Sequence, residues 1–217
     1  VPDDIDELVA TLRELPVGHP IGYLLRNTPD FADDDALADA LLNPREQSYS
    51  VPELLDLVDA SGLRFDRWVR QAPYRPQCGV MSELSHGGRL AELPPAEQYA
   101  ALELFRGTMV RHSLIAGRVD DPPSPLGLSG VDWGRCVPHR VATAVVVDDK
   151  LPPGVAAVLL NRAHTYPDLV CFATAEERTM FDAIDGHRTI AQIGGGADFF
   201  ERLWWNDLIM VDASDAT

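Results

Sequence analysis

The 217-residue sequence has few basic residues, few cysteines and no long apolar run. Its 18 Lys and Arg residues face 34 Asp and Glu residues, and the formal net charge of −16 repels phosphate backbones, so nucleic-acid binding is disfavoured. A membrane-spanning helix needs roughly 20 apolar residues in succession, so an integral membrane protein is not expected. Cys78, Cys136 and Cys171 are scattered, so we expect no disulfide framework and a reducing, cytoplasmic location.

Apolar residues make up 46% of the chain and charged residues 24%, a balance typical of a folded globular protein. The length fits one large domain or two small ones. Residues 120–130 begin Asp-Asp-Pro-Pro-Ser-Pro and continue with glycines and serines, which is typical of a linker. We therefore expect one domain over residues 1–119 and a second over residues 131–217.

The clearest secondary-structure signal lies between residues 50 and 69. Ser50 and Glu53 have the spacing of a capping box, and Gly62 is a typical helix stop. A strand is expected over residues 63–69. The order helix, glycine, strand predicts the last half of an α/β crossover unit.

Weaker patterns predict the remaining elements. In the first domain they indicate helices over 3–15, 21–26, 34–42 and 94–109, a rigid loop over 70–79 and a strand over 110–119. In the second domain they indicate a hairpin over 141–147 and 155–160, a capped helix after Thr174, helices over 189–193 and 197–205, and a strand over 208–211. Three helices followed by a terminal strand predict a winged-helix-type module.

Two local motifs have simple structural explanations. The glycine run at 194–196 lacks the Gly-x-Gly-x-x-Gly spacing of a dinucleotide loop and follows a short helix, so it predicts a turn between helices. Cys136-x-x-His139 could form half of a zinc site with His164 and Cys171, but an isolated spacing of this kind arises easily by chance. We expect neither a nucleotide nor a metal at these positions.

The last predicted helix is rich in large apolar side chains: Phe199, Phe200, Leu203, Trp204 and Trp205. It carries one basic residue, Arg202, whereas a DNA-recognition helix needs basic contacts to phosphate. Core packing explains most of these side chains. One apolar face is left for a protein or peptide partner.

Residues 44–77 carry a more specific pattern. The runs Pro-Arg-Glu-Gln-Ser-Tyr-Ser-Val-Pro-Glu-Leu-Leu at 44–55, Ala-Ser-Gly-Leu at 60–63 and Arg-Trp-Val-Arg-Gln-Ala-Pro-Tyr at 67–74 resemble the late part of class I S-adenosylmethionine-dependent methyltransferases, where such a helix feeds the sixth strand. The stretch over 97–113 looks like the insertion before the seventh strand in a bacterial branch of that group. The resemblance covers roughly residues 1–120 and implies the end of a Rossmann-like sheet with helical insertions.

The tail carries a shorter similarity. The run Phe-Asp-Ala-Ile-Asp-Gly-His-Arg-Thr-Ile-Ala-Gln-Ile at 181–193 is similar to small winged-helix domains such as the peptide chaperone of pyrroloquinoline quinone biosynthesis. It implies contact with a protein or peptide rather than with DNA. Together the two resemblances imply an α/β fold, or α+β for this chain on its own, with a small winged-helix-like domain at the C-terminus.

Methyltransferases of this class bind S-adenosylmethionine on a glycine-rich turn after their first strand, and an acid ends their second strand. This sequence has neither element. The resemblance therefore implies the C-terminal half of a longer enzyme, or one piece of a cleaved one, with S-adenosylmethionine bound only in the full-length enzyme and no cofactor-binding residue in this chain. The strand over 63–69 would pair with the missing N-terminal half or with a second copy.

Late loops and inserted helices build the acceptor side of the site in such enzymes. The substrate-binding candidates are Tyr49, Arg70, Tyr74, Arg106 and His112. The arginines could hold a carboxylate, and His112 could take a proton from a hydroxyl or amine. No local catalytic signature such as Gly-x-Ser-x-Gly is present, so a structural role is the competing interpretation for each. We expect the substrate-binding region of a methyltransferase acting on a small molecule or peptide; the alternative is a non-catalytic protein- or peptide-binding module.

Overall fold

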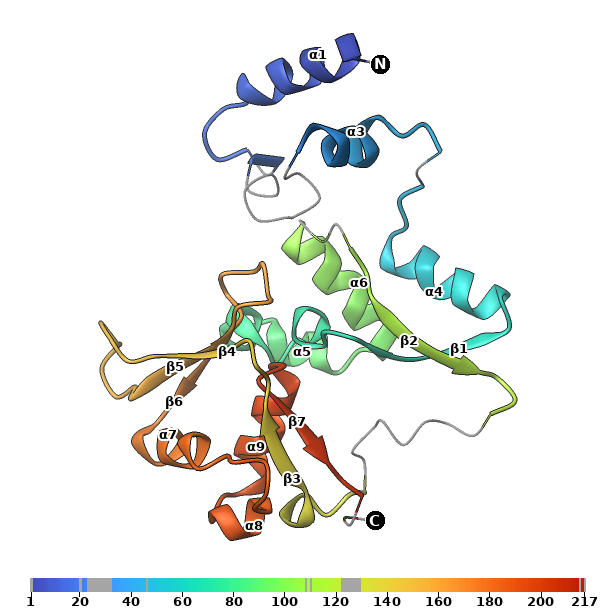
Figure 1. Cartoon of the computed structure of the whole chain (residues 1–217). Coiled ribbons are helices and arrows are strands. Elements are labelled where there is room, and N and C mark those ends of the chain that lie inside the picture. Colours follow the sequence, from blue (N-terminus) through green and yellow to red (C-terminus); the bar gives the residue numbers. More distant parts are fainter. Residues whose placement is uncertain are drawn as a thin grey trace.

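The computed structural model describes residues 2–19, 21–22, 33–45, 47–107, 109, 111–121, 130–214 and 216. Over these residues the chain is a mixed α+β protein whose strands form three small antiparallel sheets (Figure 1). The predicted mixture of helices and strands is therefore confirmed. None of the helices described is both long and apolar enough to cross a membrane.

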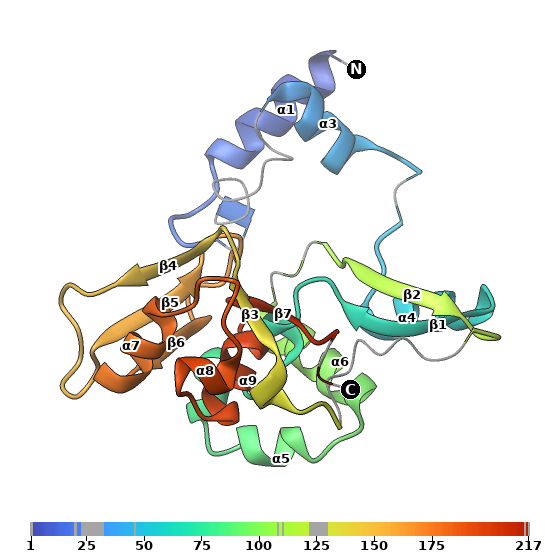
Figure 2. The same ribbon diagram turned by 60° about the horizontal axis from the view of Figure 1, so that its bottom comes forward.

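Two N-terminal helices lie together and away from all three sheets. They are α1 (Pro2–Arg13) and α3 (Asp34–Leu42), and both views show them as a separate arm (Figures 1 and 2). They confirm the helices predicted over 3–15 and 34–42. Most of the helix predicted over 21–26 falls outside the described residues.

The segment with the strongest sequence signal forms a helix and a strand. Helix α4 (Val51–Ala60) begins with the predicted capping box, in which Ser50 and Glu53 each accept a hydrogen bond from the other's backbone N–H. Gly62 has a φ of 69°, a left-handed conformation that glycine adopts at little cost, and the chain turns there into strand β1 (Leu63–Trp68). The predicted order of helix, glycine and strand is confirmed.

Strand β1 pairs antiparallel with β2 (Leu114–Arg118), and the two form a two-stranded sheet. Between them run η2 (Ala72–Tyr74), η3 (Gly79–Glu83), α5 (Gly87–Ala91) and α6 (Pro95–Arg106). Helix α6 is shorter than the predicted 94–109 because Gly107 ends it in a left-handed conformation. The core under this sheet is aromatic and contains Val51, Trp68, Tyr74 and Tyr99.

The second half of the chain contains the other two sheets. Its elements are η4 (Trp133–Arg135), β3 (Val137–Arg140), β4 (Ala144–Val147), β5 (Ala157–Asn161), β6 (Val170–Ala173), α7 (Ala175–Asp182), α8 (Ile190–Ile193), α9 (Ala197–Trp205) and β7 (Ile209–Asp212). The predicted hairpin is confirmed as β4 and β5, and β6 extends it to three strands. The terminal strand is confirmed as β7, but it pairs with β3, a strand that the sequence did not predict.

The aromatic helix α9 packs into the core of this second half. Phe199, Phe200 and Leu203 are buried together with Phe181 of α7 and Leu159 of β5. Core packing therefore explains the apolar side chains of this helix, and a role in DNA recognition is not needed to explain them. The described residues contain no group of three or more His, Cys, Asp or Glu side chains arranged to hold a metal ion, and the three cysteines are buried and unpaired.

The glycine run at 194–196 is a turn between helices α8 and α9, as predicted. Gly194 ends α8 with a φ of 87°. A Cβ on Gly195 would lie 2.3 Å from Cε2 of Phe200, whose side chain is fully buried. A Cβ on Gly196 would meet no atom within 4 Å. Gly194 therefore provides a left-handed backbone conformation, and Gly195 allows close packing against Phe200.

This difference predicts that Gly195→Ala lowers the free energy of unfolding by about 1–3 kcal/mol, because the buried ring of Phe200 has little room to move. Gly196→Ala is the matched control and should change the free energy of unfolding little. Alanine is a poorer N-cap residue than glycine, but it also makes the unfolded chain less flexible, and the two effects oppose each other. Urea denaturation of both variants measures the two effects. Equal stabilities would contradict the packing role of Gly195.

Candidate functional site

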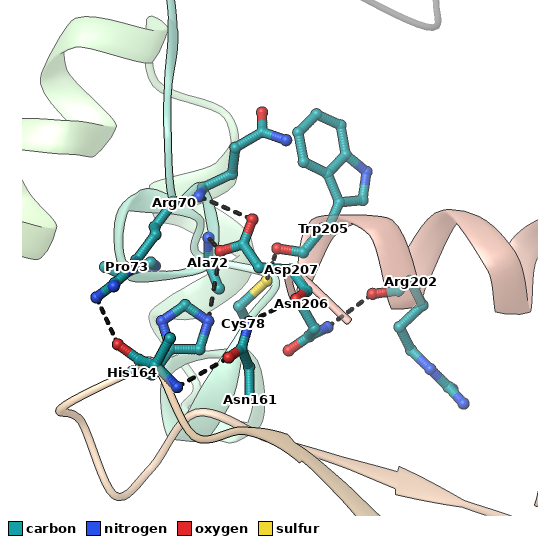
Figure 3. A network of polar contacts seen from close by, with 12 residues as sticks. Arg70, Ala72, Pro73, Cys78, Asn161, His164, Arg202, Trp205, Asn206 and Asp207 are labelled. Atoms are coloured by element: carbon teal, nitrogen blue, oxygen red, sulfur yellow. Dashed lines mark hydrogen bonds and ion pairs between the residues drawn. The ribbon is translucent and has the colours of Figure 1, made fainter. Parts of the chain in front are cut away.

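The two halves of the chain meet along the loop at residues 70–79, which follows strand β1. Asp207 accepts hydrogen bonds from the backbone N–H groups of Gln71 (3.1 Å) and Ala72 (2.9 Å). On either side of this contact, Arg70 donates to the carbonyl oxygen of Ala163 and the Cys78 thiol donates to that of Trp205. Figure 3 shows Arg70, Ala72, Cys78 and Trp205 near Asp207. The loop is thus fixed to the second half by main-chain and side-chain bonds.

Asp207 occupies the turn between α9 and β7. Its φ of 54° is unusual for a residue other than glycine, and aspartate tolerates it better than most. The side-chain amide of Asn161, at the end of β5, donates to the Asp207 carbonyl oxygen at 2.7 Å. Asn161 of β5 therefore fixes the backbone of this turn, and the Asp207 carboxylate faces the loop.

His164 lies beside this carboxylate, with Nε2 3.4 Å from Oδ2 of Asp207 and only 3% of its side chain exposed. Burial, followed by the nearby Arg70 guanidinium, lowers the pKa of His164 to about 4. Burial raises the pKa of Asp207 to about 6, although the hydrogen bonds from Ala72 and Gln71 oppose the shift. At neutral pH the pair is accordingly a neutral imidazole next to a carboxylate.

A second network includes Tyr74 of the same loop. The Tyr74 hydroxyl is 2.7 Å from Nδ1 of His112, and Nε2 of His112 is 3.2 Å from Oε1 of Glu103. Burial raises the pKa of Tyr74, so its hydroxyl stays protonated and donates to Nδ1. Nδ1 of His112 is then the acceptor, and Nε2 faces Glu103 as the donor. Trp68 stacks on the Tyr74 ring at 4.0 Å between centroids.

Arg106 links helix α6 to the loop and to the second half of the chain. Its Nε donates to the carbonyl oxygen of Pro73 at 2.9 Å, and its Nη1 lies 2.6 Å from Oδ1 of Asp168. The guanidinium also lies over the Tyr166 ring, 4.9 Å from the centroid. With 2% of its side chain exposed, Arg106 is an interior residue that couples α6 to both the loop and the second half.

Four of the five predicted substrate-binding residues gather around this loop: Arg70, Tyr74, Arg106 and His112. Each of them makes polar contacts within the chain. Tyr49 is half-buried directly before the N-cap of α4 and joins neither network.

Sequence reasoning missed the acids that face these residues, which are Glu103, Asp168 and Asp207. Glu103 lies one helical turn before Gly107, and Asp168 and Asp207 lie in turns. Their positions carry no local motif that would have identified them. The arrangement offers a buried chain of groups, Tyr74 to His112 to Glu103, through which a proton can pass. No family model matches this sequence.

Proposed function

We propose that this chain supplies the acceptor-binding, C-terminal part of an S-adenosylmethionine-dependent methyltransferase that acts on a small molecule or peptide. The observation that carries the proposal is the Tyr74–His112–Glu103 network, because it links the two stretches on which the methyltransferase resemblance rests. The order α4, β1, helical insertion, β2 is also the order that the resemblance implies.

The network suits methyl transfer to a hydroxyl or amine. Such an acceptor loses a proton as the bond to the methyl group forms, so a base near the acceptor lowers the barrier. An acceptor O–H or N–H that donates to Oη of Tyr74 would let the Tyr74 proton move to Nδ1 of His112. Glu103 would stabilise the resulting imidazolium, since its carboxylate lies 3.2 Å from Nε2.

The described residues do not form a cradle for S-adenosylmethionine. No strand among them leads through a glycine-rich turn into a helix. We propose that the donor binds to polypeptide outside this chain. The two-stranded sheet could receive that polypeptide, because β1 and β2 each pair along one edge only within the described residues.

An apolar groove beside this sheet is a second reason to expect contact with the donor-binding polypeptide. It has a volume of about 630 Å³ and is lined by α4, β1, α6 and Val119, the last being 57% exposed. Apolar surface of this kind is stabilised when another structural element covers it. We propose that the donor-binding half covers it, which makes the β1–β2 pair the end of a larger, Rossmann-like sheet.

We also propose a winged-helix-like identity for the second half of the chain. The order α7, α8, α9 and β7 supports it, together with the pairing of β7 with β3. Most of the aromatic face of α9 is used for internal packing. For this reason the methyltransferase proposal is preferred over a free-standing peptide-binding module.

The complete natural polypeptide containing these residues, incubated with radiolabelled S-adenosylmethionine and the small-molecule and peptide fractions of its source cell, is expected to label an acceptor. Tyr74→Phe and His112→Gln should each lower the turnover about 100-fold or more, because both interrupt the proton path. Tyr99→Phe is the matched control: its ring packs against Tyr74 in the same core, 6.1 Å away between centroids, and turnover should be unchanged. Full activity of both variants, or the absence of any labelled acceptor, would contradict the proposal.

A further inference from the structure

The three-stranded sheet formed by β4, β5 and β6 is apolar on both faces. Its inner face contains Val146, Leu159 and Cys171, which pack into the core of the second half of the chain. Helix α7 contributes to the same core, and both views show this helix beside the sheet (Figures 1 and 2). Neighbouring residues along a strand point to opposite faces. The outer face of the sheet therefore consists of Val145, Val147, Val158, Leu160, Val170 and Phe172.

This outer face is accessible to solvent. Phe172 is 47% exposed and Val147 is 37% exposed, and the other four side chains are half-buried. In an antiparallel sheet with one face in water, polar residues on that face normally alternate with buried apolar ones. Here all six outward positions are apolar, and the strand register places them in two adjacent rows: Val147, Val158 and Phe172, then Val145, Leu160 and Val170. A continuous apolar surface of this kind indicates contact with another protein.

The charges at the two ends of this face favour a second copy of the chain as the partner. Arg162 is exposed at one end, and its backbone N–H donates to the carbonyl oxygen of Thr143 at 3.0 Å, which continues the pairing of β4 with β5. At the other end, the exposed residues Asp148 and Asp149 follow β4 and outnumber the neighbouring Lys150. Two copies related by a two-fold axis can pack face to face with their strands running in opposite directions. This arrangement places Arg162 of each copy next to the Asp149 end of the other.

Other charges around this face affect the strength of the contact. Asp168 lies near the Arg162 end, but it is paired with Arg106. The net charge of −16 on each copy opposes association, although salt at about 0.15 M screens charges that lie more than roughly 8 Å apart. Six apolar side chains per copy are also fewer than the roughly 20–30 residues per partner in a stable interface. The contact is therefore expected to be weak and to depend on protein concentration.

We propose that the outer face of β4, β5 and β6 binds the same face of a second copy of this chain and forms a weak two-fold dimer. Burial of the six apolar side chains from each copy drives the association, and pairing of Asp149 with Arg162 of the other copy fixes the orientation. The proposal does not depend on methyl transfer, because Tyr74, His112 and Glu103 lie outside this sheet.

The first test is sedimentation velocity of the full chain at protein concentrations from about 10 to 500 µM in about 0.15 M salt. The sedimentation coefficient is expected to rise from that of a monomer toward that of a dimer. Val147→Glu places a charge in the contact and should weaken association about tenfold or more. Val119→Glu is the matched control: Val119 is 57% exposed in the groove beside the β1–β2 sheet, so the same change there should leave association unchanged.

The second test exchanges the charges at the two ends of the face. Arg162→Asp and Asp149→Arg should each weaken association about threefold or more, because each pair occurs twice in a two-fold dimer. Asp149→Arg is the decisive variant: it changes the net charge from −16 to −14, so repulsion between whole chains alone would make its association stronger. The double variant has the original net charge and should associate like the native chain.

Each of three results would overturn the proposal. A chain that remains monomeric at about 500 µM would show that a different protein covers the face. Association of Val147→Glu equal to that of Val119→Glu would place the contact elsewhere on the chain. Stronger association of Asp149→Arg, or no recovery in the double variant, would exclude the two-fold orientation.

Circular dichroism of every variant confirms that it is folded, and the exposure of Val147, Asp149 and Arg162 makes folding of these variants the expected result.

Discussion

Replacing Asp207 with alanine is expected to lower the free energy of unfolding by about 2–4 kcal/mol. The substitution leaves the backbone N–H groups of Gln71 and Ala72 without their acceptor, and both residues are buried, at 5% and 0% exposed. It also places a residue with no side-chain acceptor at a φ of 54°. The cost of burying the carboxylate, visible in its raised pKa, offsets part of the loss. Urea denaturation followed by circular dichroism measures the change.

Two controls separate the hydrogen bonds from the charge. Asp207→Asn keeps one acceptor oxygen and tolerates the left-handed backbone, so it should cost less than the alanine variant. Asp182→Ala removes an exposed carboxylate that pairs with Arg178 on the surface of α7 and should change stability by less than about 1 kcal/mol. If Asp207→Ala were no less stable than Asp182→Ala, the junction between the two halves would not depend on this carboxylate.

The Asp207 contact also marks the limit of what the sequence predicts. Capping boxes at Ser50 and Thr174 could be predicted because both partners lie within three residues of each other, and the structure has both. Asp207 and Gln71 are 136 residues apart, and neither local sequence contains a pattern that predicts this contact. The pairing of β3 with β7 was missed for the same reason.

The candidate site residues also fall into two groups, those that could be selected from the sequence and those that could not. Arg70, Tyr74, Arg106 and His112 were selected because they lie in late loops and inserted helices, and those segments do converge. Their partners could not be selected, since Glu103, Asp168 and Asp207 are common surface residue types whose burial depends on the packing of distant elements. The antiparallel pairing of β1 and β2 likewise depends on contacts across the long insertion between them.

The His164–Asp207 pair predicts a second large effect, on the pH dependence of stability. Asp207 has a folded pKa of about 6, above its ordinary value of 3.8, so its contribution to stability is complete below about pH 4 and is lost as the pH rises through 6. His164 has a folded pKa of about 4, below its ordinary value of 6.5, so its contribution is complete above pH 6.5 and is lost as the pH falls through 4. In the native protein the two contributions oppose each other over the same window.

Replacing either member should remove that member's own contribution and leave the other's unchanged, because burial is the largest cause of both shifts and persists for the residue that remains. The stability of Asp207→Asn relative to the native protein is expected to rise by about 2–3 kcal/mol between pH 4 and 6.5. That of His164→Gln is expected to fall by a similar amount, about 2–3 kcal/mol, over the same range. Urea denaturation at half-unit pH intervals gives both curves, and subtracting the native curve removes the contribution of the other titrating groups. Parallel curves for the two variants would show that the pair does not titrate as its burial requires.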